Sequence, residues 1–568
     1  MVAVGRLSET RAAARPALGR WRFTAAVAAI FAVFVLLRIV AWHRTVLLED
    51  SDSVGLVNQA KLWLTMDPAT ILAGLNPDNT PFVPVLIGLV HLLGVPLLAA
   101  GRVVSFAFSL LLFGAVLGIG VYMGGRRAAV AAVVLLACSA TLVPLSFAVL
   151  TEPAYIATVY LGLCLFLRQY RRPTPGWAIL LGAVFALAFL NRTEGLLFLL
   201  TVPGLQALHW LMERPTDYGL RRLASWSLAY ALTFLLLVTP QLWRVSRQMH
   251  GLAMNGRQAW AVLLAHPDPR SREAKLWGLD YSPSRVNIYV VQSDAGLRER
   301  LSEGESPLNF IKSAVWNLQD VYRYHTTRML GPLGVMLFTI GLVVLARRRA
   351  YFAVATVLLL GQFLTAPVVQ YHVLARHVMV LLPLALIVAG LGAAELPLFL
   401  FGFGGAWGRR AVAVTGLACT AWVAAEALPL HEALQPDTFN NEYNPAELRE
   451  PERIVRTITH NELTHRPVIA AKRGYLTLDV DGVDTVLPYT DLAGLTTYLH
   501  ANRVDFLFLE DAQIATFPFL PAFAGDPPPP GYTLLYRKAT ATNGTIALYR
   551  VNPPDAATAP NDVSSMPR

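Results

Sequence analysis

The stretch FTAAVAAIFAVFVLLRIVAWHRTVLLEDSDS, from Phe23 to Ser53, joins an apolar run to an acidic segment, and it decides the fold class. The apolar part, from Phe23 to Ala41, has about 19 residues, which is long enough for a helix to cross a bilayer. Five arginines precede it, and Trp42-His43-Arg44 follow it where a signal peptide has a cleavage site. We therefore predict a retained first transmembrane helix that leads into an acidic outer loop.

The composition of the whole chain agrees with a membrane protein. The 568 residues are 55% hydrophobic and only 15% charged, and the mean hydropathy is +0.48, values too apolar for a soluble chain of this length. The net charge of +10 comes from short clusters between apolar runs, which favours membrane topology over nucleic-acid binding. Cys138, Cys164 and Cys419 fall inside apolar runs and predict neither a disulfide framework nor a cysteine metal site.

Apolar segments of spanning length recur along the chain and predict about eleven transmembrane helices. They cover about 23–41, 101–123, 128–149, 153–169, 177–191, 195–212, 223–243, 329–346, 351–370, 378–398 and 411–429. Placing the first arginines in the cytoplasm puts every short-loop basic cluster on the same side. These clusters are 126–127, 168–172, 221–222, 347–349 and 409–410.

The same assignment of loops to the two sides excludes the apolar stretch from Phe82 to Leu98 as a span. Counting it would move Arg126 and Arg127 outside. Its prolines, and Pro81 before it, favour a broken, interfacial or re-entrant segment.

The predicted organisation therefore has four parts. A basic cytoplasmic tail (1–22) precedes a multi-pass α-helical membrane domain (23–430) with outer loops at 42–81 and 244–328. An extracytoplasmic α/β domain (431–551) and a disordered tail (552–568) follow. Strand-like runs at 468–470, 506–509, 532–536 and 546–549 and a helical pattern at 492–501 indicate the α/β domain.

The acidic loop is the first candidate for chemistry. Glu49, Asp50 and Asp52 stand directly after the first helix, where an anchored carboxylate suits a general base. The alternative is a solvated acidic loop, and the Asp-x-Asp form also leaves a divalent-metal site open. Val57, Ala60 and Leu64 share one face of a predicted short helix on the membrane surface.

Several motifs then resemble a known family in their order and position. They are Asp52-Ser53, Ala60, Pro81-Phe82-Val83-Pro84, Gly94, Arg102-Val103-Val104-Ser105, Leu150-Thr151-Glu152-Pro153, Leu190-Asn191-Arg192-Thr193-Glu194-Gly195-Leu196 and Arg376-His377 with Leu382-Pro383-Leu384. They resemble GT-C membrane glycosyltransferases of the family 39/83-like group, relatives of protein O-mannosyltransferases and of the lipid A aminoarabinose transferase. The chain departs from that group at Leu56, where many relatives have Tyr, at Ser53, where many have Glu, and at Asn79-Thr80, where the aminoarabinose branch has Lys.

The resemblance implies transfer of a sugar from a polyprenyl-phosphate carrier to an acceptor on the outer side, with Asp52 as catalytic base and Asp50 as second candidate. Because the leaving group is a phosphate, fixed cations are expected near it. The candidate substrate-binding residues are Glu49, Arg102, Glu152, Arg192, Glu194, Arg376 and His377.

Each of these positions has a structural alternative. Arg102, like Arg38 in the first helix, either binds phosphate or snorkels to the interface. Arg192 either binds substrate or pairs with Glu194, and Glu152 either binds substrate or offsets a helix dipole behind a Thr151 cap.

The predicted function is hexosyl or pentosyl transfer to a glycan, lipid or protein of the cell envelope. The alternative is a transporter or flippase for a lipid-linked substrate, which predicts charges at helix midpoints and related halves of the chain. The predicted location is the bacterial inner membrane, with the N-terminus in the cytoplasm. The predicted partners are membrane lipid, the sugar donor and the acceptor, with no nucleic acid; no cofactor is required, and a divalent metal is left open.

Overall fold

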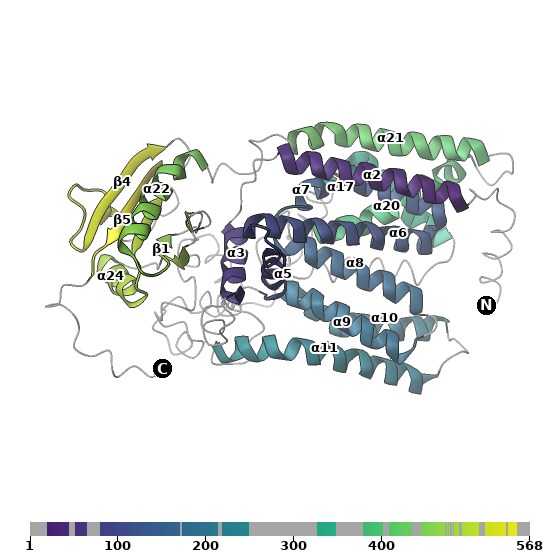
Figure 1. Ribbon diagram of the computed structural model, residues 1–568. Coiled ribbons are helices and arrows are strands. Elements are labelled where there is room, and N and C mark those ends of the chain that lie inside the picture. The colour runs from purple at the N-terminus through teal and green to yellow at the C-terminus, as the bar shows by residue number, and fades with distance from the viewer. Residues whose placement is uncertain are drawn as a thin grey trace, which may run out of the picture. The chain divides into compact units, whose positions relative to one another are not determined.

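The computed structural model describes most of the chain (Figure 1). The described residues are 20–44, 51–64, 80–170, 173–213, 219–248, 327–347, 379–401, 408–433 and, with short gaps, 445–553. The predicted span at 351–370, most of the predicted outer loop at 244–328 and nearly all of both predicted tails lie outside these residues.

The chain forms two compact units. The first comprises Met1–Val46, Arg102–Thr239 and Leu308–Thr438, and the second comprises Leu47–Gly101, Pro240–Pro307 and Phe439–Arg568.

The first unit is helical. Its elements are α2 (Arg20–Arg44), most of α6 (Leu97–Cys138), α7 (Leu142–Leu145), α8 (Thr151–Gln169), α9 (Pro175–Asn191), η1 (Thr193–Leu197), α10 (Phe198–Glu213), most of α11 (Leu220–Gln248), α17 (Thr327–Arg347), η4 (Met379–Leu381), α20 (Leu382–Phe401) and α21 (Gly408–Ala433). Neighbouring pairs such as α8 with α9 and α17 with α20 run side by side (Figure 1).

Six helices in the described part of the chain are long and apolar enough to cross a membrane. They are Trp21–His43, Leu97–Cys138, Thr193–Met212, Leu220–Arg247, Met329–Arg347 and Met379–Pro397. Large apolar side chains such as Leu36 and Leu236 are exposed on α2 and α11, as a lipid-facing surface requires. The chain is a membrane protein, and the total of eleven spans stays a prediction.

Helix α6 reverses its direction at Gly125. This glycine has φ +78° and ψ −174°, a backbone conformation that residues with a Cβ avoid. A Cβ on Gly120 would lie 2.8 Å from the Cα of Ala129, although nine residues of straight helix rise about 13 Å. The two arms correspond to the predicted segments at 101–123 and 128–149. The second predicted segment was too long, because the helix ends at Cys138. A non-helical stretch that contains the short α7 follows.

The stretch from Phe82 to Leu98 is interrupted, which agrees with the predicted broken segment. It forms α5 (Phe82–His91), and 10 residues are too few to cross a bilayer. A turn with φ +88° at Gly94 follows, and α6 starts at Leu97.

Several contacts place the basic clusters of the first unit at one end of its helices. The Arg126 guanidinium lies 5.4 Å from the Phe23 ring centroid, and Arg222 Nε donates to the Pro173 carbonyl over 2.9 Å. The ring centroids of Tyr122 and Tyr170 lie 6.0 Å apart and connect these two places. The described arginines of four predicted clusters, Arg22, Arg126, Arg168 and Arg222 among them, therefore share an end. We call it the basic end; α8 begins, and α9 ends, at the opposite end.

The second unit contains a mixed five-stranded sheet, which we call the sheet domain (445–553). Its strands are β1 (Val468–Ala471), β2 (Val483–Val486), β3 (Phe506–Glu510), β4 (Tyr532–Thr540) and β5 (Gly544–Val551), in the order β2-β1-β3-β5-β4. β1 pairs in parallel with β2 and β3, whereas β3, β5 and β4 pair antiparallel. All strands predicted from the sequence are present; β2 was not predicted.

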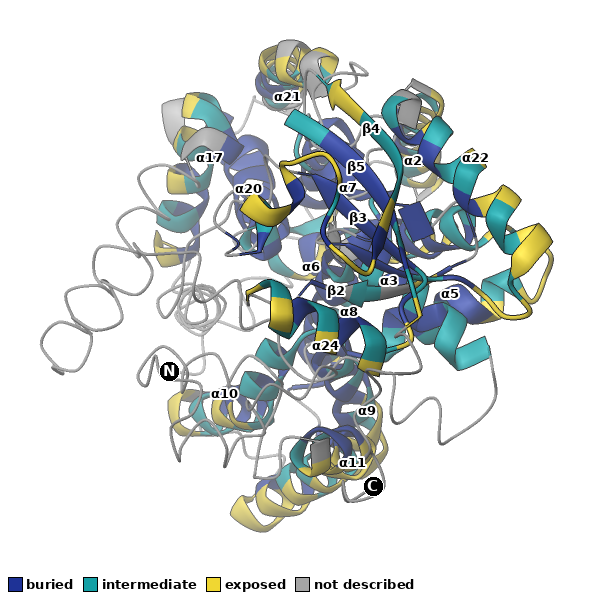
Figure 2. Cartoon of the chain, turned by 90° about the vertical axis from the view of Figure 1, so that its left-hand side faces the viewer, coloured by how far each residue is buried: buried dark blue, intermediate teal, exposed yellow. Residues whose placement is uncertain are grey.

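Helices cover this sheet. α24 (Leu492–Ala501) lies where the sequence predicts it, and Asp491 caps it by accepting from Gly494 N over 2.8 Å. The sheet domain has two core clusters. α24 belongs to one of them, and α22 (Pro445–Glu462) contributes Leu448 and Val455 to the other. Figure 2 shows the buried β3 and β5 beside the more exposed β4.

Candidate functional site

Two carboxylates converge on one arginine in the first unit. Arg192 donates through one terminal nitrogen to Glu152 Oε1 over 2.6 Å and through the other to Glu194 Oε1 over 2.9 Å. The exposed fractions of the three side chains are only 12%, 6% and 22% for Arg192, Glu152 and Glu194. We call these three residues the carboxylate–arginine cluster. With all three groups ionised, its net charge is negative.

Local backbone structure brings the cluster together. Glu152 lies in the first turn of α8, where a carboxylate is favoured by the helix dipole. Arg192 ends α9 in an extended conformation, and Glu194 lies in the 3-10 turn η1 that follows. Since α8 and α9 pack side by side, the start of one helix meets the end of the other, away from the basic end.

The structural alternatives for these residues have different outcomes. Arg192 does pair with Glu194, as one alternative predicted, but the pair with Glu152, forty residues away, was not predicted. The predicted Thr151 cap is wrong, because Leu150 occupies the N-cap position of α8 and makes no side-chain cap. The Thr151 hydroxyl instead donates to Glu152 Oε2 over 3.4 Å.

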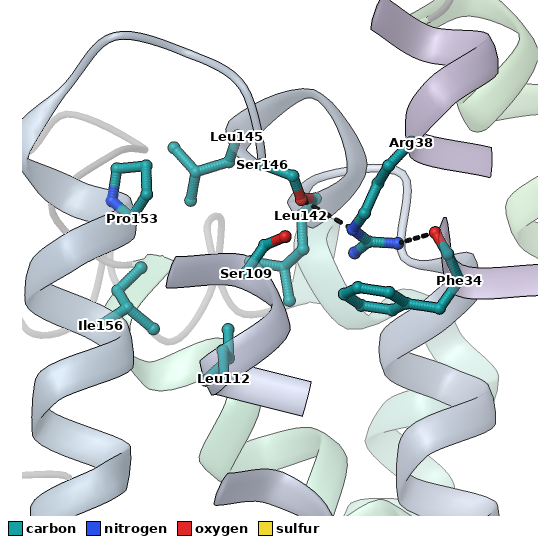
Figure 3. Close-up of a pocket in the computed structure, with 9 residues that line it drawn as sticks. All are labelled: Phe34, Arg38, Ser109, Leu112, Leu142, Leu145, Ser146, Pro153 and Ile156. Carbon is teal, nitrogen blue, oxygen red and sulfur yellow. Dashed lines mark hydrogen bonds between the residues drawn. The ribbon is translucent and has the colours of Figure 1, made fainter. Parts of the chain in front are cut away.

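A second buried arginine lies at the same end of the unit. Arg38 in α2 is 2% exposed, so the prediction that it snorkels to the interface is wrong. Its Nε donates to Ser146 Oγ over 2.8 Å, and a terminal nitrogen donates to the Phe34 carbonyl (Figure 3). The same terminal nitrogen also donates to the Ala137 carbonyl over 3.3 Å. The guanidinium also lies 3.4 Å from the Phe34 ring centroid. All of these partners are neutral.

The cavity beside Arg38 is small. Its volume is ≈ 20 Å³, about the space of one water molecule. Ser109, Ser146 and Pro153 are among its lining residues (Figure 3). A sugar does not fit there. Arg38 therefore serves mainly to hold α2 against the break after α6.

The predicted base lies at the start of a helix in the second unit. Asp52 is the second residue of α3 (Ser51–Leu64), so the predicted short helix is present. Its apolar face packs on α5, with Ala60 and Leu64 next to Gly88. The sequence predicted a helix that lies on the membrane surface. The packing on α5 shows that this helix also has a protein neighbour.

The sheet domain holds a different face of α3. Val54 packs into the core cluster that contains Val455 and Phe508. Asn58 Nδ2 donates to Thr477 Oγ1 over 3.2 Å. Lys61 Nζ donates to the carbonyls of Thr477 and Gly482 over 3.0 and 3.4 Å. The segment after the first membrane helix is thus fixed by residues more than 400 positions later.

The remaining predicted residues are distributed as follows. Arg102 lies in α6 and is half-buried. Glu49, Asp50, Arg376 and His377 lie outside the described residues. No three His, Cys, Asp or Glu side chains in the described part of the chain are placed to hold a metal ion. Asp50 of the predicted Asp-x-Asp pattern is not one of the described residues, so this metal site stays a prediction.

Two residues of interest were not singled out from the sequence. Tyr155, one turn after Glu152, is buried, and its ring centroid lies 5.9 Å from the Arg192 guanidinium. Gln59 is a buried amide in α3. Its spacing of seven residues from Asp52, two helical turns, was the signal available in the sequence.

Comparisons with known proteins agree with this architecture. The apo oligosaccharyltransferase of Archaeoglobus fulgidus matches with a TM-score of 0.59 and 11% identity, over 93% of this chain and 74% of that one. The same organism's AglB, in complex with an inhibitory peptide and a dolichol phosphate, matches at 0.54 and 11%, over 95% and 75%. ArnT from Cupriavidus metallidurans, bound to undecaprenyl phosphate, matches at 0.45 and 16%, over 93% and 98%. No protein-family model and no curated protein matches the sequence.

The class of protein follows from the fold. The chain is a membrane protein with a GT-C-like fold, as the sequence motifs predicted.

Proposed function

We propose that this protein is a glycosyltransferase that moves a hexose or pentose from a polyprenyl-phosphate carrier to a hydroxyl of a cell-envelope glycan, lipid or protein. The observation that supports it most is the carboxylate–arginine cluster. Charged groups inside a membrane domain are costly and are retained mainly where they act on a substrate. The GT-C-like fold adds support, since the AglB structure holds a dolichol phosphate.

In the proposed reaction the acceptor hydroxyl attacks the anomeric carbon of the donor sugar. Its proton passes to the Asp52 carboxylate, a step to which a positioned base typically contributes about 10²–10⁴-fold. The bond between the anomeric carbon and the phosphate oxygen breaks, and the polyprenyl phosphate leaves with the electron pair. Its position as the second residue of α3, a helix that follows the first membrane span, supports this role for Asp52.

The cluster is assigned a substrate-binding role at the outer side. Arg192 already serves two carboxylates, so its main task is to orient Glu152 and Glu194 toward sugar hydroxyls. Cations for the phosphate are then expected from Arg102, Arg376 and His377. The choice of the outer side is supported by the basic end, because an excess of arginine is typical of cytoplasmic loops.

The test is transfer by the purified full-length protein in lipid nanodiscs. Polyprenyl phosphates that carry labelled hexoses or pentoses are offered with an extract of envelope acceptors, and transferred label is measured. The parent is expected to transfer label, Asp52→Asn to lose transfer, and Asp50→Asn to keep it. Full activity of Asp52→Asn removes that residue as the base, and a dead Asp50→Asn beside an active Asp52→Asn assigns the role to Asp50.

A further inference from the structure

Helix α3 carries polar residues on two opposite faces. At about 100° per residue, positions 54, 58 and 61 lie on one face, and positions 52, 56, 59 and 63 lie on the other. The sheet domain occupies the first face through Val54, Asn58 and Lys61. The second face begins at the position of the proposed base.

Gln59 and Trp63 on this second face have buried polar atoms that no described residue satisfies. Gln59 is 4% exposed, and neither its amide oxygen nor its amide nitrogen has a hydrogen-bond partner in the described part of the chain. The indole nitrogen of Trp63, one turn further, is buried in the same way. Buried polar groups in folded proteins are almost always paired, so such atoms need an explanation.

An unpaired amide is not by itself a sign of a binding site. Gln169 is 3% exposed and also leaves both amide atoms without a partner among the described residues. It ends α8 at the basic end, far along the helix from Glu152. Gln59 differs because it shares a helix face with the proposed base.

We propose that Gln59 is a substrate-binding residue whose amide hydrogen-bonds a sugar hydroxyl held along this face of α3. The inference rests on the proposed glycosyl transfer and adds a residue to it. An amide both donates and accepts, and so does a hydroxyl, whereas a phosphate only accepts and would leave the amide oxygen unpaired. Gln59 lies about 10 Å along the helix axis from position 52, so it binds a hydroxyl remote from the reacting carbon. Trp63 offers a further N–H to the same ligand.

The experiment compares Gln59→Met with the matched control Gln169→Met in the full-length protein in nanodiscs. Binding is measured for undecaprenyl phosphate that carries a hexose or pentose and for bare undecaprenyl phosphate. Transfer kinetics and the melting temperature are measured beside it. Gln59→Met is expected to lower kcat/KM at least about tenfold, which is 1.4 kcal/mol. Its melting temperature is expected to stay the same or rise, since the lost amide has no partner among the described residues.

The two binding probes identify which sugar Gln59 meets. Weaker binding of the sugar-bearing carrier, with unchanged binding of the bare carrier, assigns the hydroxyl to the donor sugar. Unchanged donor binding with a raised KM for acceptor assigns it to the acceptor. Gln169→Met is expected to match the parent in every assay.

Two results overturn the inference. One is parental kinetics and parental binding of both probes by Gln59→Met. The other is a lowered melting temperature of that variant, which would assign the amide to the fold. A parent protein that neither binds nor transfers any of the sugars instead refutes the proposed function, and the inference fails with it.

Discussion

Removing Arg192 is the perturbation whose consequence follows most directly from the structure. The substitution Arg192→Met leaves Glu152 with an exposed fraction of only 6% and no compensating charge at 2.6 Å. Breaking a buried ion pair by removing one partner costs about 3–5 kcal/mol, because the remaining charge stays desolvated. Glu194 loses its ion pair with Arg192 as well, and we expect the loss of unfolding free energy to lie in this range.

Unfolding of the purified protein in mixed detergent micelles measures this difference. The triple variant Glu152→Gln, Arg192→Met, Glu194→Gln removes all three charges together and is expected to recover most of the stability, but not the transfer activity. Arg222→Met is the matched control. It loses one part-buried hydrogen bond at the basic end and should cost about 1 kcal/mol. A stability of Arg192→Met within about 1 kcal/mol of the parent would refute the argument.

Three further perturbations test other parts of the structure. Asp52→Asn is expected to lower kcat by about 10²–10⁴-fold with an unchanged melting temperature, and a parental rate would contradict this. Gly125→Ala is expected to cost about 1–3 kcal/mol of unfolding free energy, because it forces a Cβ into φ +78°. The helical Gly114→Ala, with open space around its Cβ, is expected to be neutral or stabilising, and equal effects of the two would argue against the reversal in α6. Lys61→Met removes two hydrogen bonds to the sheet domain and is expected to speed amide hydrogen exchange in α3; unchanged exchange would show that they do not hold the helix.

Hydrophobic length and charge order made the membrane helices predictable. Spanning length follows from runs such as 23–41, and prolines indicated that the stretch from Phe82 to Leu98 is interrupted. The end of a helix is harder to predict. The apolar run 128–149 continues past Cys138, so hydropathy alone gives no stop there.

The candidate site was predictable only in part, because its contacts join distant positions. The motif at 190–196 indicates a turn with Arg192 and Glu194, and neighbouring charges suggest a local pair. Nothing in a single sequence shows that Glu152 completes the cluster across two helices. The contact of Lys61 with Thr477 is a still longer link, formed when a C-terminal sheet domain docks on a helix near the N-terminus.

The proposed chemistry depends most directly on which side of the membrane the start of α3 faces. We would replace Cys138, Cys164 and Cys419 with alanine, introduce Ser51→Cys, and label intact cells and inverted vesicles with a membrane-impermeant maleimide. Arg126→Cys at the basic end is the control. The account predicts that position 51 reacts only in intact cells and position 126 only in inverted vesicles. Labelling of position 51 only from the cytosolic side would contradict it.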